Sequence, residues 1–152
     1  IVTKVWVMNE EGEILVLNNQ DMEFGYRTSV IKKRPFIVVQ VEMELQPGNQ
    51  EEIAAKMTEL NRRRRDKQPL EYPSAGSTFK RPEGHFAGAL IEQCGLKGVS
   101  VGGAQVSEKH AGFIINRGGA TASDILSLIK HVQARVKAQT GVTLETEIRL
   151  IG

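Results

Sequence analysis

The stretch Pro73-Ser74-Ala75-Gly76-Ser77-Thr78-Phe79-Lys80-Arg81-Pro82 gathers small residues, hydroxyl groups and two cations between two prolines. Buried hydroxyl groups are costly unless they are hydrogen-bonded, and Gly76 permits backbone turns that a Cβ forbids. Clusters of glycine, proline and serine are typical of surface loops. Two interpretations follow. The stretch is a surface connection between two elements, or it is a loop that holds an anionic ligand beside a serine that transfers a proton.

Composition limits what surrounds this stretch. The chain has 152 residues, of which 40% are hydrophobic and 25% charged, as in a folded domain or one domain with part of another. A net charge of +2 does not by itself indicate a nucleic-acid or membrane partner. Cys94 is the only cysteine, which excludes an internal disulfide and fits a reducing compartment. The chain opens at Ile1 inside an apolar run, and we interpret it as a piece of a longer protein.

The N-terminal third of the chain has the patterns of β-strands. Apolar runs at 5–8 and 14–17 flank a turn at 9–12, which predicts a β-hairpin. From Phe36 to Leu45 apolar and polar residues alternate, which predicts a half-buried strand. The face expected to be buried carries Ile37, Val39, Val41, Met43 and Leu45.

A helix is expected next. Asn49 and Glu52 have the spacing of a capping box, and Ile53, Met57 and Leu60 recur at the spacing of a helix with one buried face. The helix runs into four arginines at 62–65, which suit its C-terminal dipole. Three interpretations of the arginines are a solvated helix end, phosphate contact by one or two of them, and nucleic-acid binding. The last is weakest, because the four point in several directions and no aromatic platform accompanies them.

The second half of the chain mixes helices and strands. After a boundary at Lys67-Gln68-Pro69, a short helix is expected from His85 to Gly95, with Phe86, Leu90 and Cys94 on an apolar stripe. His85 is interpreted as a capping or packing histidine and Cys94 as a core residue. Short strands at 102–107 and 112–116 flank Lys109-His110-Ala111.

The last two elements have the clearest patterns. A capping box at Thr121 and Asp124 starts a helix that ends near Gly141. Its apolar face carries Ile125, Leu128, Ile129, Val132 and Val136. Strict alternation from 142 to 150 predicts a strand with Glu147 and Arg149 on one face. Helices and strands alternate irregularly, so the sequence predicts an α+β fold.

The sequence contains few residue patterns that are typical of catalytic sites. The chain lacks a glycine-rich phosphate loop, and His85, His110 and His131 do not have the spacing of metal ligands, so no metal site is expected. A hydrolase triad of Ser77, His110 and Asp124 is conceivable, but no nucleophile elbow supports it. The residues alone therefore lead to an α+β domain with a cationic, hydroxyl-bearing loop.

Several ordered motifs resemble one family of flavoenzymes. The motifs are Gln68-Pro69-Leu70, the stretch 73–82 above, Gly84-His85-Phe86-Ala87-Gly88, Gly95-Leu96-Lys97-Gly98, 106–113 and 144–149. Upstream, Tyr26-Arg27-Thr28-Ser29 resembles the family's Tyr-Arg-x-Ser motif. Together they cover nearly the whole chain and resemble UDP-N-acetylenolpyruvoylglucosamine reductase, also called UDP-N-acetylmuramate dehydrogenase.

The resemblance implies a reaction and a set of roles. Hydride passes from NADPH to FAD and then to the enolpyruvyl group of the UDP sugar, in cytoplasmic synthesis of bacterial cell-wall precursors. The resemblance makes Ser77 the proton donor, with Arg27 and Glu147 as the other two catalytic residues. It also implies substrate contacts from Lys80, Arg81 and Tyr26. Contacts to the cofactor are implied for Ser29, Arg64 and Gly76.

The resemblance also implies how the chain is divided. Arg81, followed by Gly84-His85-Phe86, resembles the type II branch of the family. The family's FAD pyrophosphate loops are expected before Ile1, so residues 1–66 are expected to be part of a truncated FAD-binding domain and 67–152 the substrate domain. We expect such a piece to be inactive alone and not to retain FAD. The alternatives are a non-catalytic UDP-sugar binding module and, third, a nucleic-acid binder using the arginines at 62–65.

Overall fold

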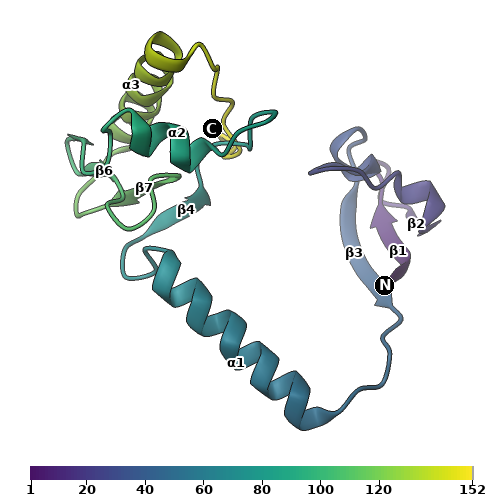
Figure 1. The fold of residues 1–152 in the computed structure, drawn as a ribbon. Coiled ribbons are helices and arrows are strands. Elements are labelled where there is room, and N and C mark those ends of the chain that lie inside the picture. Colours follow the sequence, from purple (N-terminus) through teal and green to yellow (C-terminus); the bar gives the residue numbers. More distant parts are fainter. Residues whose placement is uncertain (152) are drawn as a thin grey trace. The chain divides into compact units, whose positions relative to one another are not determined.

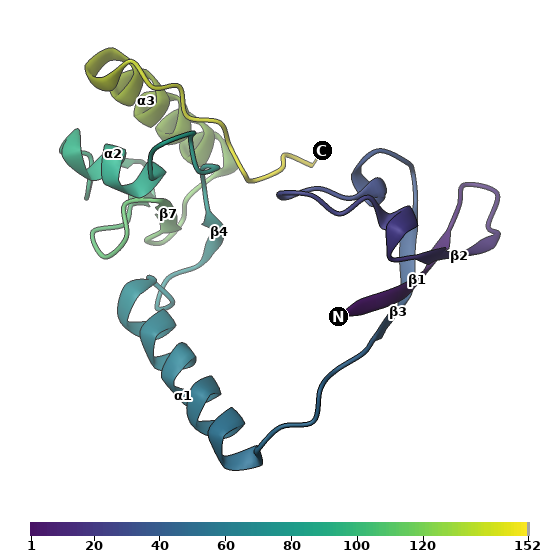
Figure 2. The same cartoon turned by 45° about the vertical axis from the view of Figure 1, so that its right-hand side comes forward.

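The computed structural model describes residues 1–151, which separate into two compact units, Ile1–Ile53 and Ala54–Gly152. Each unit has its own antiparallel sheet and its own hydrophobic core, as the strands in Figures 1 and 2 show. The fold is therefore mixed α and β, as the sequence predicts. In the described part of the chain, no helix is both long enough and apolar enough to span a membrane. The expected domain boundary between 66 and 67 stays a prediction.

The first unit is built on a three-stranded sheet of order β2-β1-β3. Strands β1 (Val2–Met8) and β2 (Ile14–Asn18) pair antiparallel and confirm the predicted hairpin. The turn closes when Asn9 Oδ1 accepts the backbone N–H of Glu13 at 2.8 Å, and Gly12 takes a positive φ of 81°. Strand β3 (Ile37–Met43) pairs with the other edge of β1.

The predicted buried face of β3 is wrong. Every residue of β3 is exposed, and Ile37, Val39 and Met43 keep 60%, 57% and 58% of their surface. The core of this unit instead consists of Val5 and Val7 with Met22 and Val30. The last two lie in two short 3-10 helices, η1 (Gln20–Met22) and η2 (Val30–Lys32). The alternation identified the strand, but no described element of its unit buries its apolar face.

Helix α1 (Gln50–Lys67) begins where the capping pattern places it. Asn49 Oδ1 accepts the backbone N–H groups of Glu51 and Glu52 at 2.9 and 3.2 Å. The inward face predicted for the helix is wrong, because α1 has no buried residue. Its apolar stripe is about half exposed, at 49% for Ile53, 59% for Met57 and 50% for Leu60.

The second unit holds a four-stranded sheet of order β4-β7-β6-β5. Its strands are β4 (Ser74–Ser77), β5 (Ser100–Val101), β6 (Ala104–Val106) and β7 (Phe113–Asn116). The stretch expected to be a loop is therefore an edge strand in its first half. Gly76 explains how a strand forms there: it takes a φ of 83° where the pairing with β7 shifts register between Ser74 and Ser77.

Two helices complete the core of this unit. Helix α2 (Ala87–Gln93) ends at Cys94, and Gly95 follows in the left-handed conformation as predicted. Helix α3 (Ala122–Thr140) has the predicted capping box at Thr121, and its buried face carries Leu128, Ile129, Val132 and Val136. Cys94 is buried as expected, whereas Phe86 is 62% exposed and so does not join the apolar stripe predicted for α2.

After α3 the chain is extended but does not form the predicted strand. A single β-bridge joins Phe79 to Thr146, with Lys80 N–H donating to the carbonyl of Glu145 at 2.8 Å. The bridge is isolated, and in the described residues neither segment belongs to a strand at this point. Leu144 is nevertheless buried, as its place in the alternation predicts.

Candidate functional site

Ser77 is the last residue of β4, and its hydroxyl donates to the carbonyl of Phe79 at 3.3 Å. The next residue, Thr78, is only 3% exposed and forms two hydrogen bonds with the segment that contains β7 and the residue before it. Its N–H donates to the carbonyl of Gly112 at 2.8 Å, and its Oγ1 accepts the N–H of Ile114 at 3.1 Å. These bonds fix the backbone on which Ser77 sits.

Glu147 comes from the C-terminal segment and lies next to this strand end. Its backbone N–H donates to the carbonyl of Thr78 at 2.9 Å, directly after the bridge at Thr146. The residue is partly buried. Two of the three residues expected to be catalytic, Ser77 and Glu147, therefore belong to hydrogen-bonded segments of the same unit.

A cavity of about 570 Å³ opens beside Ser77. Its lining includes Arg64, Tyr72, Gly76, Ser77, His110 and Phe113. Gly76 leaves backbone uncovered there, because a Cβ built on it meets no atom within 4 Å. The volume lies within the range of small-molecule sites. Arg64 and Gly76, expected to contact a cofactor, thus share one cavity with the expected proton donor.

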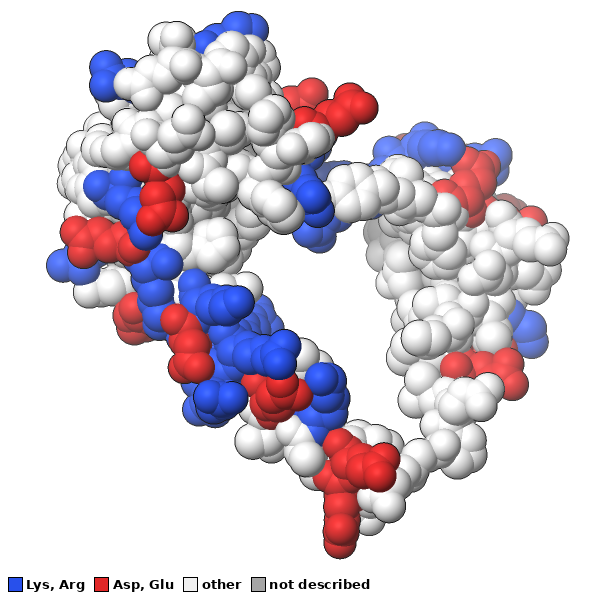
Figure 3. Space-filling model, viewed as in Figure 1, with Lys and Arg blue, Asp and Glu red and all other residues white. Residues whose placement is uncertain are grey.

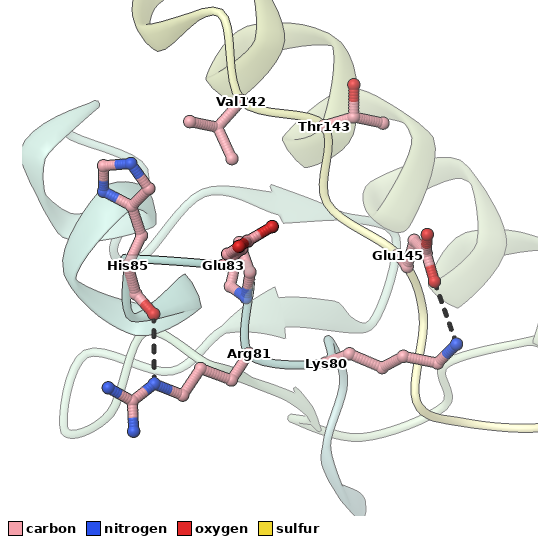
Figure 4. A pocket seen from close by; sticks show the side chains of 8 residues that line it. Lys80, Arg81, Glu83, His85, Val142, Thr143 and Glu145 are labelled. Atoms are coloured by element: carbon pink, nitrogen blue, oxygen red, sulfur yellow. Dashed lines mark hydrogen bonds and ion pairs between the residues drawn. The ribbon is translucent and has the colours of Figure 1, made fainter. Parts of the chain in front are cut away.

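Lys80 and Arg81 line a second cavity, of about 400 Å³ (Figure 4). Lys80 Nζ lies 2.9 Å from Glu145 Oε2, and the dashed line in Figure 4 marks this ion pair. The hydrogen bond and the positive charge of Lys80 lower the pKa of the Glu145 carboxyl. Glu145 therefore stays ionised as the partner of a cation expected to contact substrate.

Arg81 is held by its neighbours in the same cavity. Its Nε donates to the carbonyl of His85 at 3.3 Å, and its guanidinium lies 4.0 Å from the centre of the Phe86 ring. Phe86, although exposed, is therefore in contact with the Arg81 guanidinium. His85 lines the cavity as well, and the interpretation as a cap is wrong, since Phe86 is the residue at the N-cap of α2.

Tyr26, Arg27 and Ser29 lie together in the first unit. Gly25 and Thr28 exchange two backbone hydrogen bonds, of 3.1 and 3.3 Å, and close a tight turn that presents Tyr26 and Arg27. Tyr26 is 74% exposed. Arg27 takes a φ of +56°, which costs a residue with a Cβ roughly 1–2 kcal/mol. Such strained residues cluster at functional sites.

Positive side chains gather over the C-terminal half of α1, with negative ones among them and at the N-terminal end of the helix (Figure 3). Arg63 forms an ion pair with Glu59 one turn earlier, and Arg64 Nε donates to Gln68 Oε1 at 3.1 Å. Arg64 is the one that also lines the Ser77 cavity. Among residues 1–151, no three histidine, cysteine or acidic side chains group as metal ligands.

Of two further residues that line the Ser77 cavity, Tyr72 was missed from the sequence, and His110 was considered there only as part of a hydrolase triad. Tyr72 is braced by Arg117, which hydrogen-bonds the phenol oxygen and stacks at 4.6 Å from the ring centre. His110 reaches the cavity because the loop before β7 lies next to the end of β4. Both placements depend on the pairing of strands distant in sequence, for which the local pattern gave no signal.

Comparison with known proteins decides the family. The model of the UDP-N-acetylenolpyruvoylglucosamine reductase C-terminal domain matches residues 68–151, more than half of the chain. The chain belongs to this family. The match includes the lining of the second cavity, the lining of the Ser77 cavity except Arg64, and the segments that carry Ser77 and Glu147.

Reductases of bacteria are among the proteins similar to the chain. It is 56% identical over its whole length to the UDP-N-acetylenolpyruvoylglucosamine reductase of Caldanaerobacter subterraneus, covering 50% of that protein. The reductase of Lachnoclostridium phytofermentans is 60% identical over 96% of the chain, which covers 47% of that relative. A crystal structure of the Thermus caldophilus reductase superposes with a TM-score of 0.82 at 36% identity, over 97% of this chain and 52% of that one. The chain thus spans about half the length of the reductases it matches.

Proposed function

We propose that the protein reduces the enolpyruvyl group of UDP-N-acetylglucosamine enolpyruvate to UDP-N-acetylmuramate, with NADPH as the electron donor. The single observation that carries the proposal is the bond from Glu147 N–H to the carbonyl of Thr78 at 2.9 Å. This bond places the segment that carries the Glu147 carboxylate beside Ser77, which lines a cavity large enough for a ligand. Membership of the reductase family supports the same reaction.

In this proposal the chain's own residues manage charge and a proton. Addition of hydride to the double bond leaves negative charge on the substrate, which needs a cation or hydrogen-bond donors and then a proton at the adjacent carbon. Ser77 Oγ–H gives that proton. Arg27 polarises the substrate carboxylate, and Glu147 helps to stabilise the enol form. The left-handed backbone of Arg27 fits a side chain that must be held in one direction.

Lys80 and Arg81 are proposed to bind the anionic part of the UDP sugar in the second cavity, and Tyr26 to contact substrate from its exposed turn. A flexible, compact ammonium and a planar guanidinium are the two cations that proteins use for phosphate groups. Lys80 must then exchange Glu145 for the ligand, because the two are ion-paired without it.

The residues of the Ser77 cavity suit a contact with FAD, because Arg64 offers a cation and Gly76 an uncovered backbone stretch beside a cavity of about 570 Å³. Ser29, in the first unit, is proposed separately as a cofactor contact. The chemistry that FAD would supply when bound is the transfer of hydride from NADPH to the substrate. We further propose that residues 1–66 are part of an FAD-binding domain and 67–152 the substrate domain. By the same proposal the protein is of the type II branch and acts in the bacterial cytoplasm, where its product supports cell-wall synthesis, cell shape and division.

The test replaces the matched 152 residues of the Caldanaerobacter reductase by this chain, giving what we call the exchange protein. The proposal predicts NADPH oxidation that depends on the UDP sugar, with UDP-N-acetylmuramate identified by mass spectrometry. The parent reductase is the positive control. An exchange protein that folds and binds the UDP sugar without turnover would instead support a non-catalytic binding module. The chain expressed alone is expected to carry no flavin absorbance after purification.

A further inference from the structure

His110 lines the Ser77 cavity, and the reaction proposed above assigns no role to this residue. The loop that carries His110 is fixed by hydrogen bonds to the side chain of Ser107, which is only 1% exposed. The Ser107 hydroxyl oxygen accepts the backbone N–H groups of Lys109 and His110, both at 3.2 Å. The histidine therefore stands on a fixed backbone at the edge of the cavity.

The imidazole ring is held as firmly as its backbone. Its edge contacts the Phe113 ring at a centroid distance of 5.0 Å and an angle of 67°. Gly88 and Gly112 make room for it, because a Cβ on either would lie 3.3 or 3.0 Å from His110 Cε1. Both distances are tighter than ordinary carbon contacts. The imidazole ring of His110 is thus closely packed against Gly88, Gly112 and the Phe113 ring.

The hydrogen bonds assign the proton on the ring. His110 Nδ1 accepts the backbone N–H of Gly112 at 3.1 Å, so Nδ1 carries no hydrogen. The ring proton is then on Nε2, and the side chain is a neutral donor.

The same bonds connect the ring to the serine strand. Gly112 donates its N–H to His110 and accepts the N–H of Thr78 with its carbonyl at 2.8 Å. The imidazole is therefore two hydrogen bonds away from the residue that follows Ser77.

We propose that His110 donates its Nε2–H to the Ser77 oxygen as that oxygen gives up its proton, an inference that rests on the proposed function. The Oγ–H bond breaks, a C–H bond forms on the substrate, and the negative charge left on Oγ receives the hydrogen bond. The imidazole keeps its proton, and water returns one to Ser77. A serine is a poor acid, and a preorganised donor aimed at the developing oxyanion is what an enzyme needs there.

Two substitutions separate this role from a structural one. His110→Asn places an amide oxygen near the position of Nδ1, which retains the Gly112 bond and removes the outer donor. His110→Gln places an amide nitrogen near the position of Nε2 and loses the inner acceptor. In the exchange protein, we expect His110→Asn to slow the step that consumes the UDP sugar by about 10²-fold. His110→Gln should retain most of the rate, and both should reduce flavin with NADPH normally.

A purely structural histidine predicts the opposite order, with His110→Asn active and His110→Gln impaired, and that result overturns the inference alone. An unsubstituted exchange protein without turnover overturns the proposed function and this inference together. Should both variants unfold, ¹⁵N NMR of the unsubstituted protein decides. A proton on Nε2 supports the proposal, and a proton on Nδ1 overturns it.

Discussion

The backbone N–H of Glu147 donates to the carbonyl oxygen of Thr78 at 2.9 Å. This bond and the one from Lys80 N–H to the carbonyl of Glu145 fix the register of the C-terminal segment against the end of β4. A shift of this register by one residue would reverse the two faces of the C-terminal segment. The Glu147 side chain would then point in the direction in which the side chains of Thr146 and Ile148 now point. The site therefore depends on a pairing that a single bridge and two hydrogen bonds define.

Glu147→Gln in the exchange protein should lower the rate of the step that consumes the UDP sugar by about 10²-fold. The change removes a charge while it retains the shape of the side chain and the backbone bond to Thr78. Single-turnover measurement of flavin reoxidation by the UDP sugar gives the rate. Flavin reduction by NADPH should stay unchanged.

Glu145→Gln is the matched comparison, two residues earlier on the same segment. Its carboxylate pairs with Lys80 and is exposed, so the maximal rate should stay within a few-fold of the parent. The Michaelis constant for the UDP sugar should fall, because Lys80 no longer has to release a competing carboxylate. Equal losses of maximal rate in the two variants would contradict the assignment of Glu147.

The Lys80–Glu145 pair predicts a pH dependence. The hydrogen bond and charge of Lys80 hold the pKa of Glu145 below its ordinary 4.5. A carboxyl whose pKa is lower in the folded state stabilises the fold above its unfolded pKa and loses that contribution as the pH falls through the folded value. NMR titration should show the pKa of Glu145 rising toward its ordinary value in Lys80→Met. An unchanged titration would mean that the pair does not form in solution.

Gly103→Ala should destabilise the second unit by about 3 kcal/mol. A Cβ on Gly103 would lie 2.4 Å from the carbonyl oxygen of Gly118 and 2.5 Å from the nitrogen of Ala120, both backbone atoms that cannot rotate away. Gly119→Ala is the control, because it meets no atom within 4 Å and bears only the cost of a φ of 67°, about 1 kcal/mol. Urea denaturation compares the two, and similar midpoints would contradict the packing seen around Gly103.

Much of the fold could be predicted from local signals. The hairpin, the cap at Asn49, the capping box at Thr121, the glycine after α2 and the buried face of α3 all follow from spacing within a few residues. The wrong predictions concern which other element packs against a given strand or helix. Apolar spacing on β3 and α1 predicted buried faces that no described element of their units covers. The alternation after Gly141 predicted a strand, but in the described residues that segment forms only an isolated bridge, from Thr146 to Phe79.

The site divides in the same way. Ser77, Arg27 and Glu147 were assigned by resemblance, since neither a serine in a glycine-rich stretch nor an acid on an alternating segment has a distinctive spacing of its own. His110 and Tyr72 reach the Ser77 cavity only through strand pairing and the packing of the adjoining loops. The ion pair of Lys80 with Glu145 joins positions 65 residues apart, which no local pattern connects.

The central claim is that Ser77 supplies the proton in the second half of the reaction. Ser77→Ala in the exchange protein tests it most directly, with Ser100→Ala on the far strand β5 as the control. We predict that NADPH bleaches the flavin of Ser77→Ala at the parent rate. Reoxidation by the UDP sugar should fall by at least about 10²-fold. Equal loss of both half-reactions, or reoxidation at the parent rate, would contradict the account.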